Sequence, residues 1–323
     1  TKPRKAARPV NSFVVCVEAV LPIFVLMAAG YLCQRLGVIK REAVPAMNRV
    51  AFTVFLSTMV FNSIYTSDIA ASVDPFLLAY TAVAAVVVFA AASAVVNAAV
   101  PVENQKGVMV QGMFRSNFVM VGLAVAENLL PEGEMGTVAV LVAVIIPIYN
   151  VLAVVTLSAH GGEAAGWTGV LRKIATNPLI VATVLALAMA ALGLRLPAVL
   201  ERCVAQVAAV STPLMLFLLG AFFEFKSLPR YGRQLAVVCL FRLVLVPAAV
   251  LGVAVALGIE STGLVALIAV FATATAIASF TMAQQMGGDA ELAGDIVVAT
   301  SVLCPFTIFG FAYALMSLGL IAG

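Results

Sequence analysis

The chain has 323 residues, of which 63% are hydrophobic and 10% are charged, and its mean hydropathy is +1.14. A soluble domain is closer to half apolar and a quarter charged, so this composition excludes an ordinary soluble protein and indicates a polytopic, all-α membrane protein. The net charge of +3 gives no basic surface for nucleic acid, which we therefore do not expect as a partner.

Residues that carry metal or covalent chemistry are scarce. The single histidine, His160, is expected in a loop, and all five cysteines fall inside or beside apolar runs, which is typical of small buried hydrophobic side chains. The sequence therefore predicts no metal site and no cofactor, and it favours a protein that is not an enzyme.

Apolar segments follow one another through the chain, separated by turn residues such as "SVDP", "LLPEGE" and "MGGD". A spanning helix needs about 20 apolar residues. We expect ten transmembrane helices, at 13–35, 44–65, 75–99, 104–128, 134–159, 178–194, 200–223, 233–258, 261–286 and 290–320. This divides the chain into an N-terminal tail (1–12), five helices (13–159), a connection (160–177) and five further helices (178–323).

Basic residues gather in the connections on one side of the expected bundle. Those after the first, third, fifth, seventh and ninth helices carry or adjoin Arg35, Lys40, Arg41, Arg49, Lys106, Arg172, Lys173, Lys226, Arg230 and Arg233. Cytoplasmic loops are enriched in Lys and Arg, so we expect a multi-pass protein of the inner or plasma membrane with both termini non-cytoplasmic. The basic tail at 1–12 argues for the opposite orientation, but it holds fewer charges.

The longest cytoplasmic connection contains "GWTGVLRKIATNP". Trp167, Val170, Leu171 and Ile174 fall on one helical face. That pattern predicts a short amphipathic helix lying on membrane lipid, and a plain loop with one interfacial tryptophan is the alternative.

Landmarks of the first half recur in the second. Pro22 and Gly37 bracket the first expected helix, and Pro178 and Gly193 bracket the sixth, 156 residues later in both cases. A near-constant offset indicates duplication of a five-helix unit. Because five is odd, the second copy must be inverted in the membrane, which is typical of secondary transporters.

Polar residues interrupt the helices expected at 104–128 and 261–286, at matching depths. The first carries Arg115, Ser116 and Asn117 in a row, and the second carries a group of hydroxyl residues: Thr273, Thr275, Ser279 and Thr281. An unwound stretch survives in a bilayer only where protein or a water-filled cavity surrounds it. We therefore expect two broken, crossing helices whose freed N–H groups and half-helix dipoles hold an anion.

Arg115 adds a full positive charge at this depth, where an arginine costs about 2.5–3.5 kcal/mol on insertion scales. That cost predicts an anionic partner. The partner is either a substrate or a buried carboxylate, with Glu18, Glu127 and Asp295 as the candidates. For the hydroxyl residues, helix packing alone is the alternative to substrate binding.

Further polar residues lie within the expected spans. Tyr149 and Asn150 follow Pro147 and are expected to line the same site, with Ser57 on its opposite wall. Glu18 and Asp295 are candidates for a coupling proton, because burial raises the pKa of a carboxyl group. Arg242 is expected either to attract the anion or to pair with an acid.

Six segments in order resemble the auxin efflux carrier family: "LPIFVLMAAGYLCQRLGVI", "RSNFVMVGLAVAENL", "IYNVLAVVTL", "KIATNPLIVATVLAL", "STPLMLFLLGAFF" and "SFTMAQQMGGDAELAGDIVVAT". The resemblance implies two inverted five-helix repeats related to the bile-acid sodium symporter fold, with the fourth and ninth helices broken and crossing. It further implies a homodimer and an elevator movement of a transport domain against a scaffold. Asn117 matches the family's crossover asparagine, and Gly122 matches the glycine that follows it.

Three positions depart from the family pattern. Ala124, Ala274 and Ser57 stand where the family usually has proline. Because proline removes a backbone N–H and forces a break, the two crossing helices are expected to be less sharply kinked here.

The sequence thus predicts a secondary transporter of a small organic anion, a carboxylate such as a malate- or malonate-like acid or an indole acid. Its substrate-binding residues are Ser57, Arg115, Ser116, Asn117, Gly122, Tyr149, Asn150, Thr273, Thr275 and Ser279. Proton or sodium is the expected coupling ion. A membrane sensor without transport and an intramembrane enzyme are the alternative classes.

Overall fold

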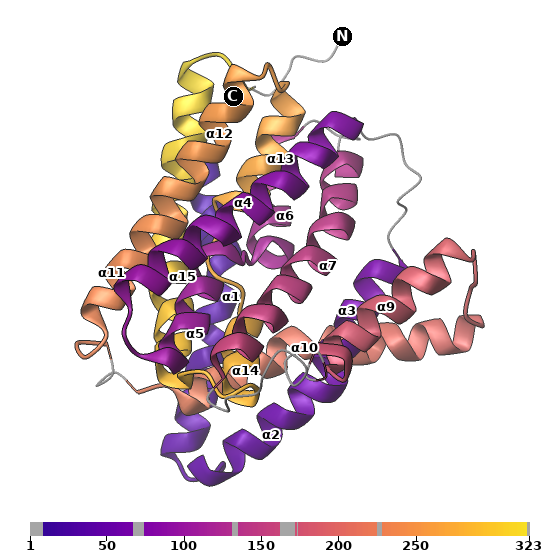
Figure 1. Ribbon diagram of the computed structural model, residues 1–323, viewed down its shortest axis with the longest axis vertical. Coiled ribbons are helices and arrows are strands. Elements are labelled where there is room, and N and C mark those ends of the chain that lie inside the picture. The colour runs from indigo at the N-terminus through magenta and orange to yellow at the C-terminus, as the bar shows by residue number, and fades with distance from the viewer. Residues whose placement is uncertain are drawn as a thin grey trace.

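The computed structural model describes residues 9–66, 74–130, 135–161, 172, 174–224 and 228–321. Only the helical backbone, and not the side chain, is described at these residues: 9–20, 119, 120, 136, 139, 142 and 143. Within these ranges the chain is helical and contains no strand (Figure 1). Most of the expected amphipathic segment lies outside the described residues, and of its remainder residues 172, 174 and 175 are helical. Residues 1–8 of the tail expected at 1–12 also lie outside the described residues, whereas residues 9–12 belong to helix α1.

The helices of the first half begin and end as follows: α1 (Pro9–Arg35), η1 (Arg41–Ala43), α2 (Val44–Val50), η2 (Ala51–Leu56), α3 (Ser57–Tyr65), α4 (Pro75–Ala99), α5 (Glu103–Phe114), η3 (Phe118–Gly122), α6 (Leu123–Leu129) and α7 (Met135–His160). Those of the second half are α9 (Pro178–Ala191), α10 (Ala198–Phe222), α11 (Gly232–Leu240), η4 (Phe241–Leu245), α12 (Val246–Ala256), α13 (Ser261–Phe271), α14 (Ala278–Gln285) and α15 (Ala290–Ser317). The segments η2, η3 and η4 are π-helical and continue directly into an α-helix.

Helical segments lie in all ten ranges expected from the sequence. Five helical stretches in the described ranges are long and apolar enough to cross a membrane: Arg41–Tyr65, Pro75–Ala99, Ala198–Phe222, Gly232–Ala256 and Ala290–Ser317. Large apolar side chains stand on the outer surface, such as Val83 on α4 and Val184 on α9. A surface of this kind suits lipid rather than water.

The helices pack in two groups that meet at the centre of the molecule. Helix α3 contacts both α9 and α10, and these three extend to one side, whereas α4, α5, α7, α13 and α15 lie in the other group (Figure 1). Helix α1 packs along α10 at very short range, because a Cβ atom at Gly220 would lie 1.9 Å from the Met27 carbonyl oxygen. Only glycine allows this approach of two backbones.

A polar cluster joins three helix ends at one edge of the fold. Asp289 caps α15 by accepting from the Leu292 amide at 3.1 Å, and it also accepts from the Tyr231 hydroxyl at 2.9 Å and the Gln105 amide at 3.1 Å. Burial, and then the hydrogen bond to Asp289, raise the pKa of Tyr231 well above its usual range. The cluster therefore ties the beginnings of α5, α11 and α15 together.

Candidate functional site

Two interruptions of helical structure meet at the centre of the molecule. Residues 115–117 separate α5 from η3, and residues 272–277 separate α13 from α14. An antiparallel bridge pairs Ser116 with Thr275. Its hydrogen bonds run from the Asn117 amide to the Ala274 carbonyl at 2.8 Å and from the Ala276 amide to the Arg115 carbonyl at 3.2 Å. We call these two segments the paired interruptions.

Side chains satisfy carbonyl groups that the interrupted helices leave free. The Thr275 hydroxyl donates to the Gly112 carbonyl at 2.8 Å, and the Thr273 hydroxyl donates to the Ala269 carbonyl at 3.4 Å. A buried backbone group without a partner is costly in a medium without water. These threonines are therefore engaged with the backbone of the ends of α5 and α13.

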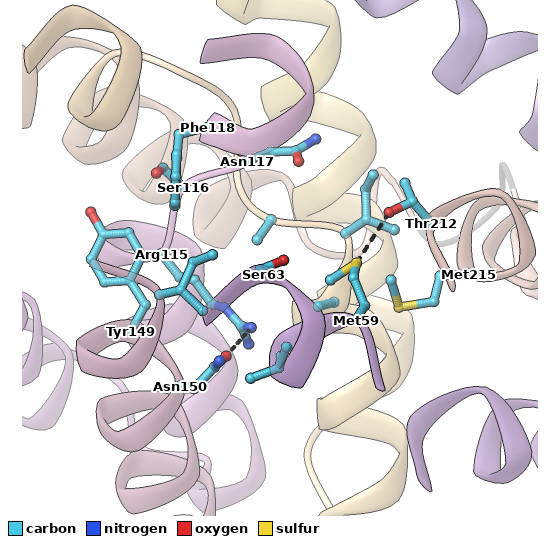
Figure 2. A pocket seen from close by; sticks show the side chains of 15 residues that line it. Met59, Ser63, Arg115, Ser116, Asn117, Phe118, Tyr149, Asn150, Thr212 and Met215 are labelled. Atoms are coloured by element: carbon cyan, nitrogen blue, oxygen red, sulfur yellow. Dashed lines mark hydrogen bonds between the residues drawn. The ribbon is translucent and has the colours of Figure 1, made fainter. Parts of the chain in front are cut away.

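A pocket with about 620 Å³ of empty space, part of it open to solvent, lies beside the paired interruptions (Figure 2). It is lined by Met59, Val60, Ser63, Arg115, Ser116, Asn117, Phe118, Ile146, Tyr149, Asn150, Thr212, Met215, Ala276, Ile277 and Ala278. The paired interruptions and α7 form one wall, and α3 and α10 form the other. The pocket thus lies where the two groups of helices meet.

The Arg115 guanidinium projects into the middle of this pocket (Figure 2). Only 6% of the residue is exposed. The guanidinium donates to the Asn150 amide oxygen at 2.7 Å, to the Gln111 amide oxygen at 3.4 Å and to the sulfur of Met282. All three are neutral, and among the described residues no carboxylate forms an ion pair with Arg115. The pairing with Glu127 or Asp295 that the sequence left open is not observed.

Four further polar atoms of the lining have no hydrogen-bond partner among the described residues. They are Ser116 Oγ, Asn117 Nδ2, Tyr149 Oη and Asn150 Nδ2. All four can donate a hydrogen bond. A buried cation with neutral partners, in a lining that also carries donors without a partner among the described residues, forms a site that is complementary to an anion.

Five of the ten predicted substrate-binding residues line the pocket: Arg115, Ser116, Asn117, Tyr149 and Asn150. The other five lie outside its lining: Ser57, Gly122, Thr273, Thr275 and Ser279. Ser57 donates to the Phe52 carbonyl at 3.2 Å within its own helix. Gly122 allows η3 to approach α13, because a Cβ atom there would lie 2.4 Å from the Ala269 carbonyl oxygen.

Sequence reasoning placed Ser57 of the helix expected at 44–65 on the opposite wall, but it missed the residues that form this wall. Met59, Val60 and Ser63 come from α3, and Thr212 and Met215 come from α10. The Thr212 hydroxyl lies 3.6 Å from the Met59 sulfur, so the two helices also contact each other at the pocket. The available signal was Pro213, a proline inside α10 directly beside Thr212.

Asp295, one of the two coupling candidates, is not part of this lining. Asp295, on the first turns of α15, is buried and lines a separate pocket of about 180 Å³ together with Glu224 and Glu291. The side chain of Glu18, on α1, lies outside the described residues.

In the part of the chain that the structure describes, an apolar helical fold with polar side chains in a central pocket is the arrangement expected of a multi-pass membrane transporter. The chain matches the profile of the family described as "Membrane transport protein" over residues 15–166 and 167–312. It therefore belongs to this family, the one that the sequence resemblance identified as the auxin efflux carriers.

Two curated proteins are similar to the chain. One, from Rhizobium meliloti (strain 1021), is named "Putative malonate transporter" and is 27% identical over 320 residues, covering 92% of this chain and 95% of its own length. The other is named "Uncharacterized transporter", from Methanothermobacter thermautotrophicus (strain ATCC 29096 / DSM 1053 / JCM 10044 / NBRC 100330 / Delta H). It is 33% identical over 66 residues, 20% of this chain and 22% of its own length.

Proposed function

We propose that the protein is a secondary transporter of small organic carboxylates. The observation that carries the proposal is the Arg115 guanidinium, which is buried among neutral partners in the same lining as four unused hydrogen-bond donors. A carboxylate would supply the missing negative charge and accept from the donors. Transport by this route needs no covalent step.

The ends of the interrupted helices support the same assignment. Segment η3 begins at Phe118 and α14 begins at Ala278, and both residues line the pocket. The beginning of a helix carries free N–H groups and a partial positive charge. The dipole of the eight-residue α14 and the charge of Arg115 therefore favour the same sign of ligand.

We propose further that ten spans form two inverted five-helix repeats, with the broken fourth and ninth helices crossing at the pocket. The antiparallel bridge between Ser116 and Thr275 supports this arrangement, since equivalent segments of inverted copies run in opposite directions. The distribution of basic residues supports an inner or plasma membrane location with both termini non-cytoplasmic.

The composition of the pocket supports alternating access by an elevator movement. In this scheme α1, α2, α3, α9 and α10 form a scaffold, and the remaining helices carry the substrate across the membrane as one body. The scaffold wall presents the apolar side chains of Met59, Val60 and Met215. A wall of this kind makes few directional bonds, so the polar wall with its ligand can slide along it. We expect a homodimer, as in the family, and a proton or sodium as coupling ion, with Asp295 and Glu18 as candidates.

A malonate- or malate-like acid and an indole acid remain the candidate substrates. The name of the Rhizobium relative supports the first kind.

Flux of radiolabelled malonate, malate and an indole carboxylic acid into proteoliposomes tests the proposal. We expect saturable flux of at least one acid. Arg115→Ala should raise the apparent KM by about tenfold to a hundredfold, because a charge-assisted hydrogen bond to the ligand is lost. Arg202→Ala, which removes an exposed arginine of α10, is the matched control and should behave like the wild type. Wild-type KM and rate in Arg115→Ala would refute the site, and saturable binding without flux would indicate a sensor.

A further inference from the structure

Arg242 is a second arginine at the paired interruptions, and it lies in η4 rather than in either interrupted helix. Its side chain is fully buried, with 0% of the residue exposed. The guanidinium donates to three backbone carbonyls: Thr273 at 2.9 Å, Phe114 at 3.2 Å and Val270 at 3.4 Å. One side chain therefore holds the end of α5 and the end of α13 at the same time.

The helix ends explain why a cation is stable in this position. The last turn of a helix carries unpaired carbonyls and a partial negative charge, and α5 and α13 both end at this guanidinium. Arginine offers five donors in a fixed planar arrangement and keeps its charge when buried. Arg242 thus compensates two negative helix ends, whereas the positive beginnings of η3 and α14 line the substrate pocket.

Two of the carbonyls that accept from Arg242 would accept from backbone amides if the helices were uninterrupted. In a continuous α-helix, the Phe114 carbonyl would accept from the Phe118 amide and the Val270 carbonyl would accept from the Ala274 amide. Both carbonyls accept from Arg242 instead. Its hydrogen bonds therefore compete directly with continuation of α5 and of α13 through the interruptions.

This competition matters because the chain has alanine at position 274, inside the second interruption, where a proline would remove an amide and force the break. Alanine is the residue with the highest helix propensity. Another device must keep these segments unwound, and the bonds of Arg242 to Phe114 and Val270 supply it.

We propose that Arg242 is the positioning residue of the substrate site, and that it acts by holding both helix ends open rather than by contacting the substrate. Its effect on transport rests on the function proposed above, whereas its effect on the backbone does not. The anion then meets Arg115, and Arg242 remains behind the site.

The test measures backbone and transport separately in Arg242→Met, Arg242→Gln and Arg242→Lys. Hydrogen exchange of the Asn117 and Ala276 amides measures how stably the paired interruptions are held together, because both amides donate hydrogen bonds from one interruption to the other. We expect Arg242→Met to speed their exchange at least about tenfold, with the middle of α10 unchanged as an internal control. The apparent KM for a transported carboxylate should rise at least about tenfold with a smaller change in the maximal rate, and Arg242→Lys should fall between Met and the wild type.

Exchange and KM that match the wild type in folded Arg242→Met would overturn the proposal. Should the methionine variant fail to fold, the comparison of glutamine with lysine decides, because only lysine keeps the charge. Equal defects in both of these variants would then contradict a role for the charge. Absence of flux in the wild-type protein would refute the proposed function and leave the exchange result valid, so the two failures are distinguishable.

Discussion

The Asn150 amide oxygen accepts a hydrogen bond from the Arg115 guanidinium at 2.7 Å, and this bond joins α7 to the paired interruptions. The acceptor is neutral, so it orients the guanidinium without cancelling its charge. In this geometry Asn150 also directs its own NH2 group, which has no partner among the described residues, away from the arginine.

Asn150→Asp is expected to be more damaging than Asn150→Ala. The aspartate would place a carboxylate next to Arg115 and form an ion pair with the guanidinium, which would then be unavailable to the substrate. Alanine would remove only the hydrogen bond between residue 150 and Arg115. We expect the KM for a transported carboxylate to rise about a hundredfold for aspartate and about tenfold or less for alanine. Transport assays on both variants, at equal amounts of folded protein, check the order. Equal effects would show that the charge of Arg115 is not what holds the substrate.

The site could be predicted in part because burial of charge is expensive. Arg115, Ser116 and Asn117 stand out in an apolar run, and a polar triplet in a membrane helix indicates an unwound segment and a pocket wherever it occurs. The helical segments likewise follow the ten apolar ranges that the sequence defines. Both signals are local, so they are visible without the fold.

The partners of the polar side chains could not be predicted, because tertiary packing decides them. The Thr275 hydroxyl could donate equally well to a substrate or to the Gly112 carbonyl. It donates to Gly112 because α5 places that carbonyl beside it. The same holds for Arg242. The sequence suggested a substrate anion or an acidic side chain as its partner, whereas in the structure its guanidinium donates to three backbone carbonyls. The wall from α3 and α10 carries no charge, so apart from Pro213 its sequence resembles that of ordinary apolar surface.

Substitutions of Thr275 test whether its hydroxyl stabilises the fold or contacts the substrate. Thr275→Val removes the hydroxyl that satisfies the Gly112 carbonyl, and leaving that carbonyl buried and unpaired should cost about 1–3 kcal/mol of stability. Thr275→Ser keeps the hydroxyl and should retain the wild-type KM and most of the stability. Thermal unfolding in detergent and transport kinetics measure the two effects. A large rise in KM for valine without loss of stability would instead support direct contact with the substrate, as the sequence alone suggested.

Ala274→Pro should be tolerated. The Val270 carbonyl, to which the Ala274 amide would donate in a continuous helix, already accepts from Arg242, so proline removes no such bond. We expect stability within about 1 kcal/mol of the wild type, because proline also restricts the unfolded chain. In the Arg242→Gln background the proline should lower the raised KM, since it enforces the same break. Ala276→Pro is the control and should impair transport, because the Ala276 amide donates to the Arg115 carbonyl at 3.2 Å. Equal behaviour of the two proline variants would contradict this account of the break.

The number of positive charges at the pocket predicts a preference among carboxylates. Among the described residues, Arg115 is the one arginine or lysine in the lining, and Arg242 is engaged with backbone carbonyls. A second carboxylate on the substrate would lose its hydration without gaining a cation, which is unfavourable in a buried site. Malonate and its monoamide have nearly the same size and differ by one charge.

We therefore expect the monoamide to compete for transport at least as well as malonate, and its advantage should disappear in Arg115→Gln, where neither ligand meets a cation. Inhibition of labelled substrate uptake in proteoliposomes gives both constants at fixed pH. If malonate binds at least about tenfold more tightly than the monoamide in the wild type, the pocket must recruit a second cation, most simply by releasing Arg242 from the carbonyls of Phe114, Val270 and Thr273. That result would assign Arg242 to the substrate and overturn its positioning role.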